Sequence, residues 1–156
     1  MADRLAGAGY QFTQGSYAYG EVISSSGNTS GAYAADSLIA AIYHRFVIFE
    51  PMFKEIGTGA ATVTGGATYF TTDFTANGLD TGLSAGQSIV YPFANQTNVS
   101  VNFFSDNEEP DPVPTQNEVG YPISIHANIL STVVVQTFTV QPRGGAALQV
   151  QLMQST

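Results

Sequence analysis

The chain has 156 residues, of which 44% are hydrophobic and only 10% are charged. Four basic residues stand against twelve acidic ones, so the formal net charge is −8; a polyanion would be repelled, which makes nucleic acid and anionic membrane surfaces poor candidates as partners. The chain has no cysteine for a disulfide or a thiolate metal site, and no apolar run reaches the roughly 18 residues of a membrane span. Neutral polar side chains carry most of the polarity, which is typical of an extracellular surface.

Helical patterns are confined to the first third of the chain. A short helix is expected at residues 3–8, ending at Gly7-Ala8-Gly9. Residues 10–32 are rich in Ser, Gly and Asn, which predicts a loop. Residues 33–47 are predicted to form one helix that ends before Pro51, because apolar residues recur along one stripe: Leu38, Ile39, Ile42 and Phe46.

The next element is a predicted β-hairpin from Ile56 to Phe74, with Gly65-Gly66 as its turn. Phe70 and Phe74 alternate with polar residues, so the helix at 33–47 is expected to pack against the face that bears them. The glycine-rich residues 75–87 are expected to form a linker or long loop.

From residue 88 onward the pattern predicts β-structure, with strands at about 121–127, 132–140 and 146–153. An immunoglobulin-like (Ig-like) sandwich needs about seven strands, so residues 88–156 are not expected to complete a sheet within one copy. The apolar alternation in the last strand is the clearest of the chain: Ala146, Leu148, Val150 and Leu152. We expect its edge to pair with the first half or with a second copy.

Four segments of the first half carry sequence motifs. Residues 2–10 read ADRLAGAGY and resemble a "DR…AGY" helix exit, and residues 20–23 read GEVI and resemble a "GENI" loop. Tyr43-His44-Arg45 with residues 53–59 resembles "GHR…fTEIGvG", and residues 68–74 resemble the strand "YWvqdFG". In this order, residues 2–76 resemble the bacterial branch of the CAP superfamily (cysteine-rich secretory, antigen 5 and pathogenesis-related proteins; SCP-like domains).

The resemblance implies an α+β fold in two parts. Residues 1–79 would be the C-terminal part of an α-β-α sandwich, and residues 80–156 a linker followed by an antiparallel, Ig-like β segment. The linker match lies in residues 90–97 and 107–114. The family also implies a secreted or cell-surface bacterial protein, whose signal peptide and first cleft histidine are expected upstream of Met1.

Family members hold two histidines and two acidic residues in a cleft that can bind a divalent cation. By resemblance, Glu21 and His44 belong to this cleft, and Asp36 is the acid between them in sequence. Glu21 and His44 are therefore the expected ligands of Zn²⁺ or Ca²⁺, and no other cofactor is indicated. The alternatives are a solvated loop carboxylate for Glu21 and, for His44, a histidine near a helix C-terminus that complements the helix dipole.

Two further polar groups are expected to be structural. His126 alternates with core-facing residues of its strand and is expected on the surface. An acidic run is interleaved with prolines, which favours a stiff, solvated linker over a Ca²⁺ site: Asp106, Glu108, Glu109 and Asp111.

The sequence therefore predicts a binding module with a cleft for a small ligand, a divalent cation or a partner, and no catalytic residues. The expected partner is a small apolar ligand or a protein. The alternative is a structural subunit that self-associates, through exposed β edges, into an extracellular assembly or filament. A metal-dependent hydrolase ranks third, because it needs more ligands than Glu21 and His44 provide.

Overall fold

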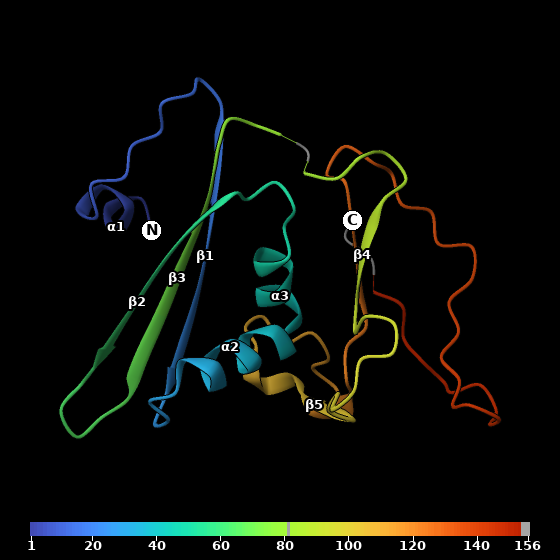
Figure 1. Cartoon of the computed structure of the whole chain (residues 1–156). Helices are drawn as coiled ribbons and strands as arrows, with labels where there is room; N and C mark the ends of the chain where they lie inside the picture. The colour runs from blue at the N-terminus through green and yellow to red at the C-terminus, as the bar shows by residue number, and fades with distance from the viewer. Residues whose placement is uncertain (81, 154–156) are drawn as a thin grey trace.

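The computed structural model describes residues 1–80 and 82–153 (Figure 1). With 17% helix and 28% strand in antiparallel sheets, the chain belongs to the α+β class, as expected. The first part of the chain runs through α1 (Ala2–Gly7), β1 (Tyr17–Ser26), α2 (Gly31–Ala40), α3 (Ile42–Ile48), β2 (Glu55–Thr62) and β3 (Thr68–Asn77). The second part contains β4 (Ser88–Tyr91), β5 (Asn102–Phe104), the 3₁₀ turn η1 (Ser105–Asn107), β6 (Glu118–Gly120) and β7 (Ser124–Ala127).

The main sheet is antiparallel, with the strand order β1-β3-β2. The hairpin of β2 and β3 confirms the predicted one: Gly65 has φ 71° in the turn, and the Val63 amide donates to the Ala67 carbonyl at 3.0 Å. β1 corrects the loop expected at residues 10–32, because its ten residues pair with β3 from Tyr17↔Asn77 to Ser26↔Thr68. Serine and glycine indicated a loop, but the ladder with β3 overrides that local preference.

The inner face of this sheet packs against α2 and α3. Val22 of β1, Leu38 of α2 and Phe74 of β3 form the buried cluster, which confirms the expected contact of Leu38 with the strand that bears Phe74. A Cβ at Gly20 would lie 2.7 Å from Val47 Cγ1, so only glycine allows α3 to approach β1 this closely.

The helix predicted at 33–47 is in fact two helices. Ala41 has φ −74° and ψ 118°, an extended conformation that ends α2 and begins α3. Leu38 of α2 and Ile42 of α3 are buried, whereas Phe46 of α3 is 45% exposed and is therefore not part of the buried stripe that it was expected to share with them.

The second part of the chain forms two small sheets, β4-β7 and β5-β6. The strand expected at 121–127 is reduced to β7, and the strands expected at 132–140 and 146–153 do not form, since the described residues 128–153 contain no strand. An alternating sequence becomes a strand only when a neighbouring strand pairs with its backbone, and one copy does not supply that neighbour to these residues. Among the described residues, no helix is both long and apolar enough to cross a membrane.

Candidate functional site

The outer face of the main sheet, opposite α2 and α3, collects polar side chains. Neighbouring residues of a strand point to opposite faces, so Glu21 and Asp73, which follow and precede the inner Val22 and Phe74, point outward. Helix α1 and the segment after it contact this face through Arg4 and Tyr10. We refer to these polar residues as the outer-face cluster: Arg4, Tyr10, Glu21, Glu55, Asp73 and Thr75.

Arg4 and Glu21 form an ion pair at one end of this cluster. Arg4 Nε donates to Glu21 Oε2 at 2.6 Å, and its Nη2 donates to Oε1, so both carboxylate oxygens are engaged. The hydrogen bond from Arg4 lowers the pKa of Glu21. Bidentate pairing of this kind is among the stronger charge-assisted contacts.

Asp73 sits directly beside this pair, because Glu21 and Asp73 are Cα partners across β1 and β3. Burial, followed by its hydrogen bond with Glu21, raises the pKa of Asp73. The Asp73 Oδ1 atom is buried without a hydrogen-bond partner in the described chain. On its other side, Gly57 of β2 is its Cα partner and adds no side chain that could fill the space.

The other end of the cluster centres on Glu55. The Tyr10 hydroxyl donates to Glu55 Oε2, and Thr75 Oγ1 lies 3.0 Å from the Tyr10 oxygen and 3.2 Å from Glu55 Oε2. The hydrogen bond to Glu55 is the main cause that raises the pKa of Tyr10. These contacts hold the segment after α1 against β2 and β3.

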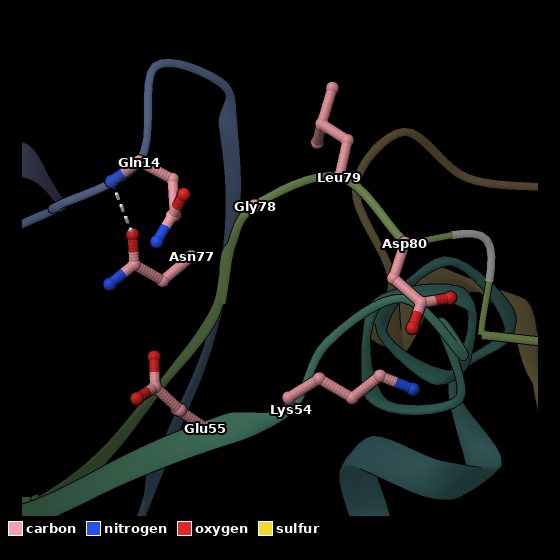
Figure 2. Close-up of a pocket in the computed structure, with 7 residues that line it drawn as sticks. All are labelled: Gln14, Lys54, Glu55, Asn77, Gly78, Leu79 and Asp80. Carbon is pink, nitrogen blue, oxygen red and sulfur yellow. Dashed lines mark hydrogen bonds between the residues drawn. The ribbon is translucent and has the colours of Figure 1, made fainter.

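A pocket of about 520 Å³ continues from Glu55 toward the end of β3 (Figure 2). Most of the residues that line it are of polar or charged type: Gln14, Lys54, Glu55, Asn77 and Asp80, together with Gly78 and Leu79. Figure 2 shows Gln14 and Asn77 on one side and Asp80 on the other, with Glu55 below Asn77 and Lys54 below Asp80, at the start of β2. The volume lies in the range of small-molecule sites.

Two structural details shape this pocket. Asn77 Oδ1 accepts from the backbone amides of Thr13 at 2.9 Å and Gln14 at 3.0 Å, which fixes one wall. A Cβ at Gly82 would lie 1.9 Å from the Pro51 carbonyl oxygen, so glycine is required where the segment after β3 passes the start of β2.

Aromatic rings adjoin the cluster along β1. Phe12 stacks on Tyr17, with ring centroids 4.1 Å apart and planes inclined by 18°. Tyr17 and Tyr19 alternate with inner-face residues and therefore lie on the outer face with Glu21, where they are 49% and 44% exposed. Their rings offer apolar and cation-binding surface beside the carboxylates.

The three residues expected in one cleft have separate surroundings. Glu21 is held by Arg4, whereas His44 Nδ1 lies 3.1 Å from Glu108 Oε1, and Asp36 is exposed on α2. His44 lies in the first turn of α3 rather than near a helix C-terminus, so the alternative role, in which it complements the helix dipole, is wrong. Within the described residues, no three His, Asp or Glu side chains are grouped to hold a metal ion. Glu21 and His44 therefore have different partners in the part of the chain that the structure describes.

Two other expectations are wrong because tertiary contacts bury the residues. Glu108, expected in a solvated linker, is buried and accepts hydrogen bonds from the first turn of α3. His126, expected on the surface, is only 5% exposed: its Nε2 lies 3.1 Å from Ser124 Oγ, and its ring lies 4.5 Å from that of Phe46. Burial, and then the charge of Arg45, lower the pKa of His126 to about 4.

Most of the outer-face cluster was not identified from sequence, although a signal for it exists. Arg4 and Tyr10 lie in the first motif segment, Glu21 in the second, Glu55 in the third and Asp73 in the fourth. Each of the four motif segments thus contributes to one face of one sheet, whereas Tyr43-His44-Arg45 of the third segment lies in α3 on the other side. Comparison with protein-family models, curated proteins and solved structures gives no match to this chain.

Proposed function

We propose that the protein is a binding module, and that its ligand occupies the outer-face cluster and the adjoining pocket. The observation that carries this proposal is that each of the four motif segments contributes at least one polar side chain to that face, although Tyr43-His44-Arg45 of the third segment lies in α3 on the opposite side of the sheet. The layers support the CAP-like interpretation, because α1 lies against the outer face while α2 and α3 cover the inner face. By the same resemblance, and from its low charge, the module works outside the cell or at its surface.

The lining favours a small polar ligand with a protonated amino group over the apolar ligand expected from the sequence. Carboxylates outnumber cationic groups, since Glu21, Glu55, Asp73 and Asp80 stand against Arg4, Lys54 and the ammonium group of Met1. An ammonium group would gain charge-assisted hydrogen bonds from the acids. The exposed tyrosine rings of β1 would add cation–π attraction.

Binding without chemistry is the better-supported activity. Ser124 and His126 lie at hydrogen-bonding distance from each other, and a Ser–His pair of this kind could serve as nucleophile and base. Both residues are buried, at 3% and 5% exposure, and neither lines the pocket. A substrate therefore has no access to them, and the contact of Ser124 with both Arg45 and His126 gives the pair a structural role.

The test is a titration followed by amide NMR spectra, with glucosamine as the cationic probe and N-acetylglucosamine as its neutral analogue. We expect glucosamine to shift the resonances of Gln14, Asn77 and Gly78, and N-acetylglucosamine to shift them much less. Glu55→Gln should weaken glucosamine binding by about tenfold or more, because one charge-assisted contact is lost.

The matched control is Asp36→Asn, which removes the same unit of charge from the exposed surface of α2. Its affinity for glucosamine should equal that of the wild type. A loss of affinity would place Asp36 in the site, as the resemblance implied. Equal shifts with both sugars would reject the amino-group requirement. No shift at the pocket with either sugar would reject this ligand class.

A further inference from the structure

The C-terminal segment, residues 128–153, has few hydrogen-bond partners within one copy. In the stretch 132–153 the backbone amides donate two hydrogen bonds within the described chain, from Gly145 to Pro142 at 2.9 Å and from Leu148 to Val140 at 2.8 Å. Its alternating apolar side chains remain in solvent, with Leu148 53% and Val150 41% exposed. A strand-forming sequence with unpaired amides and exposed apolar residues is a template for pairing with another chain.

β2 offers a complementary feature, because it is an unprotected edge strand. It lies at the end of the order β1-β3-β2, all eight of its residues are exposed, and Figure 1 shows it at the rim of the sheet. Natural edge strands are usually protected by charges, proline or bulges. From Ile56 to Thr62 this strand has neither a charge nor a proline, and its glycines 57 and 59 leave the edge open.

The charge distribution favours contact between these two regions in different copies. All twelve acidic residues lie in residues 1–118, together with three of the four basic ones, so that part carries a formal charge of −9. Residues 119–156 contain no acidic residue, and Arg143 gives them a charge of +1. Residues 1–118 of two copies therefore repel each other, whereas residues 119–156 of one copy are attracted to residues 1–118 of another.

We infer that residues 146–153 of one copy pair as a strand with the free edge of β2 in a second copy. Strand β2 and the segment 146–153 are each eight residues long. Ile56 is the Cα partner of Phe74, so it lies on the inner-face side, where it is 66% exposed. The apolar side of the added strand would cover Ile56, and Gln149 and Gln151 would lie on the outer-face side.

This contact joins two different surfaces, so it builds oligomers by head-to-tail addition. A reciprocal exchange closes a dimer, and successive additions give a ring or a filament. Of the outer-face cluster and the pocket lining, only Glu55 belongs to β2, and the contact uses the backbone edge of that strand rather than the Glu55 side chain, so self-association and ligand binding are tested by different variants.

The first experiment uses the absence of cysteine from the chain. Gln149→Cys is mixed under mild oxidation with each of Gly57→Cys, Gly59→Cys and Ala61→Cys, which lie on the outer-face side of β2 and together sample the register. Added Cβ atoms at Gly57 and Gly59 meet no atom within 4 Å, so these variants should fold. Cysteines on adjacent strands have the Cβ separation that a disulfide needs.

We expect at least one β2 variant to form a mixed disulfide with Gln149→Cys about tenfold faster than the control Asp36→Cys, because pairing raises the effective concentration. If Gln149→Cys forms a disulfide only with a second copy of itself, the pairing with β2 is overturned, and two C-terminal segments contact each other instead. Equal rates for all partners, Asp36→Cys included, would mean random collision and would also overturn it.

The second experiment measures the mass in solution by light scattering from about 10 μM to about 1 mM, the range for weak to moderate affinities. The wild type should grow in mass with concentration, and Val150→Lys should remain monomeric. Gln149→Lys adds the same charge on the other side of the strand and should associate like the wild type. Both positions are exposed in one copy, so neither variant should unfold. A wild type that is monomeric throughout would refute the inference.

Discussion

Glu108 Oε1 lies 3.0 Å from the backbone nitrogen of His44 and 3.1 Å from its ring Nδ1, although 64 positions separate the two residues. The same oxygen accepts from the Tyr43 amide at 2.5 Å, so a residue of the second part caps the first turn of α3. Arg45, which is 0% exposed, caps the preceding helix by donating to the Ile39 carbonyl at 2.6 Å. The two side chains thus satisfy the backbone groups that the break at Ala41 leaves without helical partners.

The first prediction concerns this cap. Glu108→Ala should lower the free energy of unfolding by about 1–3 kcal/mol, because two amides of α3 would lose their buried acceptor. Glu108→Gln keeps one acceptor oxygen and should cost less. Both values come from chemical denaturation.

Glu109→Ala is the matched control, since the neighbouring Glu109 is exposed and its removal should change stability by no more than about 0.5 kcal/mol. If Glu108→Ala is as stable as Glu109→Ala, the cap contributes nothing to stability.

The second prediction concerns pH and His126. Its pKa in the folded protein is about 4, below the value of 6.5 expected in the unfolded chain. As pH falls below about 6.5, the unfolded state therefore binds the proton first, and stability falls until about pH 4. The loss should reach roughly 3 kcal/mol.

His126→Gln keeps a hydrogen-bonding group near Ser124 but cannot titrate. Denaturation series from pH 7.5 to 4 should show a shallower decline of stability for this variant than for the wild type. Parallel curves for the two proteins would mean that His126 does not titrate as its buried position implies.

The third prediction concerns the carboxylate pair of the outer face, where the pKa of Asp73 is raised by burial and by Glu21. The folded state therefore disfavours the charged form of Asp73, so Asp73→Asn should raise the denaturation midpoint at pH 7. The gain should shrink as pH falls through the raised pKa, because the wild type then protonates Asp73. Asp80→Asn, in the exposed segment after β3, should leave the midpoint nearly unchanged. A lower midpoint for Asp73→Asn would contradict the raised pKa.

The fourth prediction compares two strand glycines. Gly20→Ala places a Cβ 2.7 Å from Val47 Cγ1 and 2.9 Å from the Phe53 ring, so overpacking should cost about 1–3 kcal/mol. Gly57→Ala meets no atom within 4 Å and should cost little or nothing. Thermal unfolding of the two variants checks the difference. Equal melting temperatures would show that α3 can move away from β1 at little cost.

Local sequence patterns were sufficient where an element depends on its own neighbours. The glycines at 65 and 66 and the alternation around Phe70 and Phe74 identified the β2-β3 hairpin, because a turn and a two-residue period are local properties. The apolar stripe likewise identified Leu38 as a residue that packs on Phe74. At the candidate site, the motif match identified Glu21 as a site residue. Its neighbours Arg4 and Asp73 were not identified, because the sequence does not show which elements pack together on one face of the sheet.

The sequence by itself determined the α+β composition, the hairpin, the apolar stripe of α2 and the acidic charge of residues 1–118. Only the tertiary structure decided the break at Ala41, because it depends on Glu108, 64 positions beyond His44, and on the contact of Arg45 with Pro122, 77 positions away. It also decided the burial of His126, which Phe46 and Ser124 surround. At residues 146–153 the alternation predicted a strand that one copy does not form, because a strand also needs a partner for its backbone hydrogen bonds.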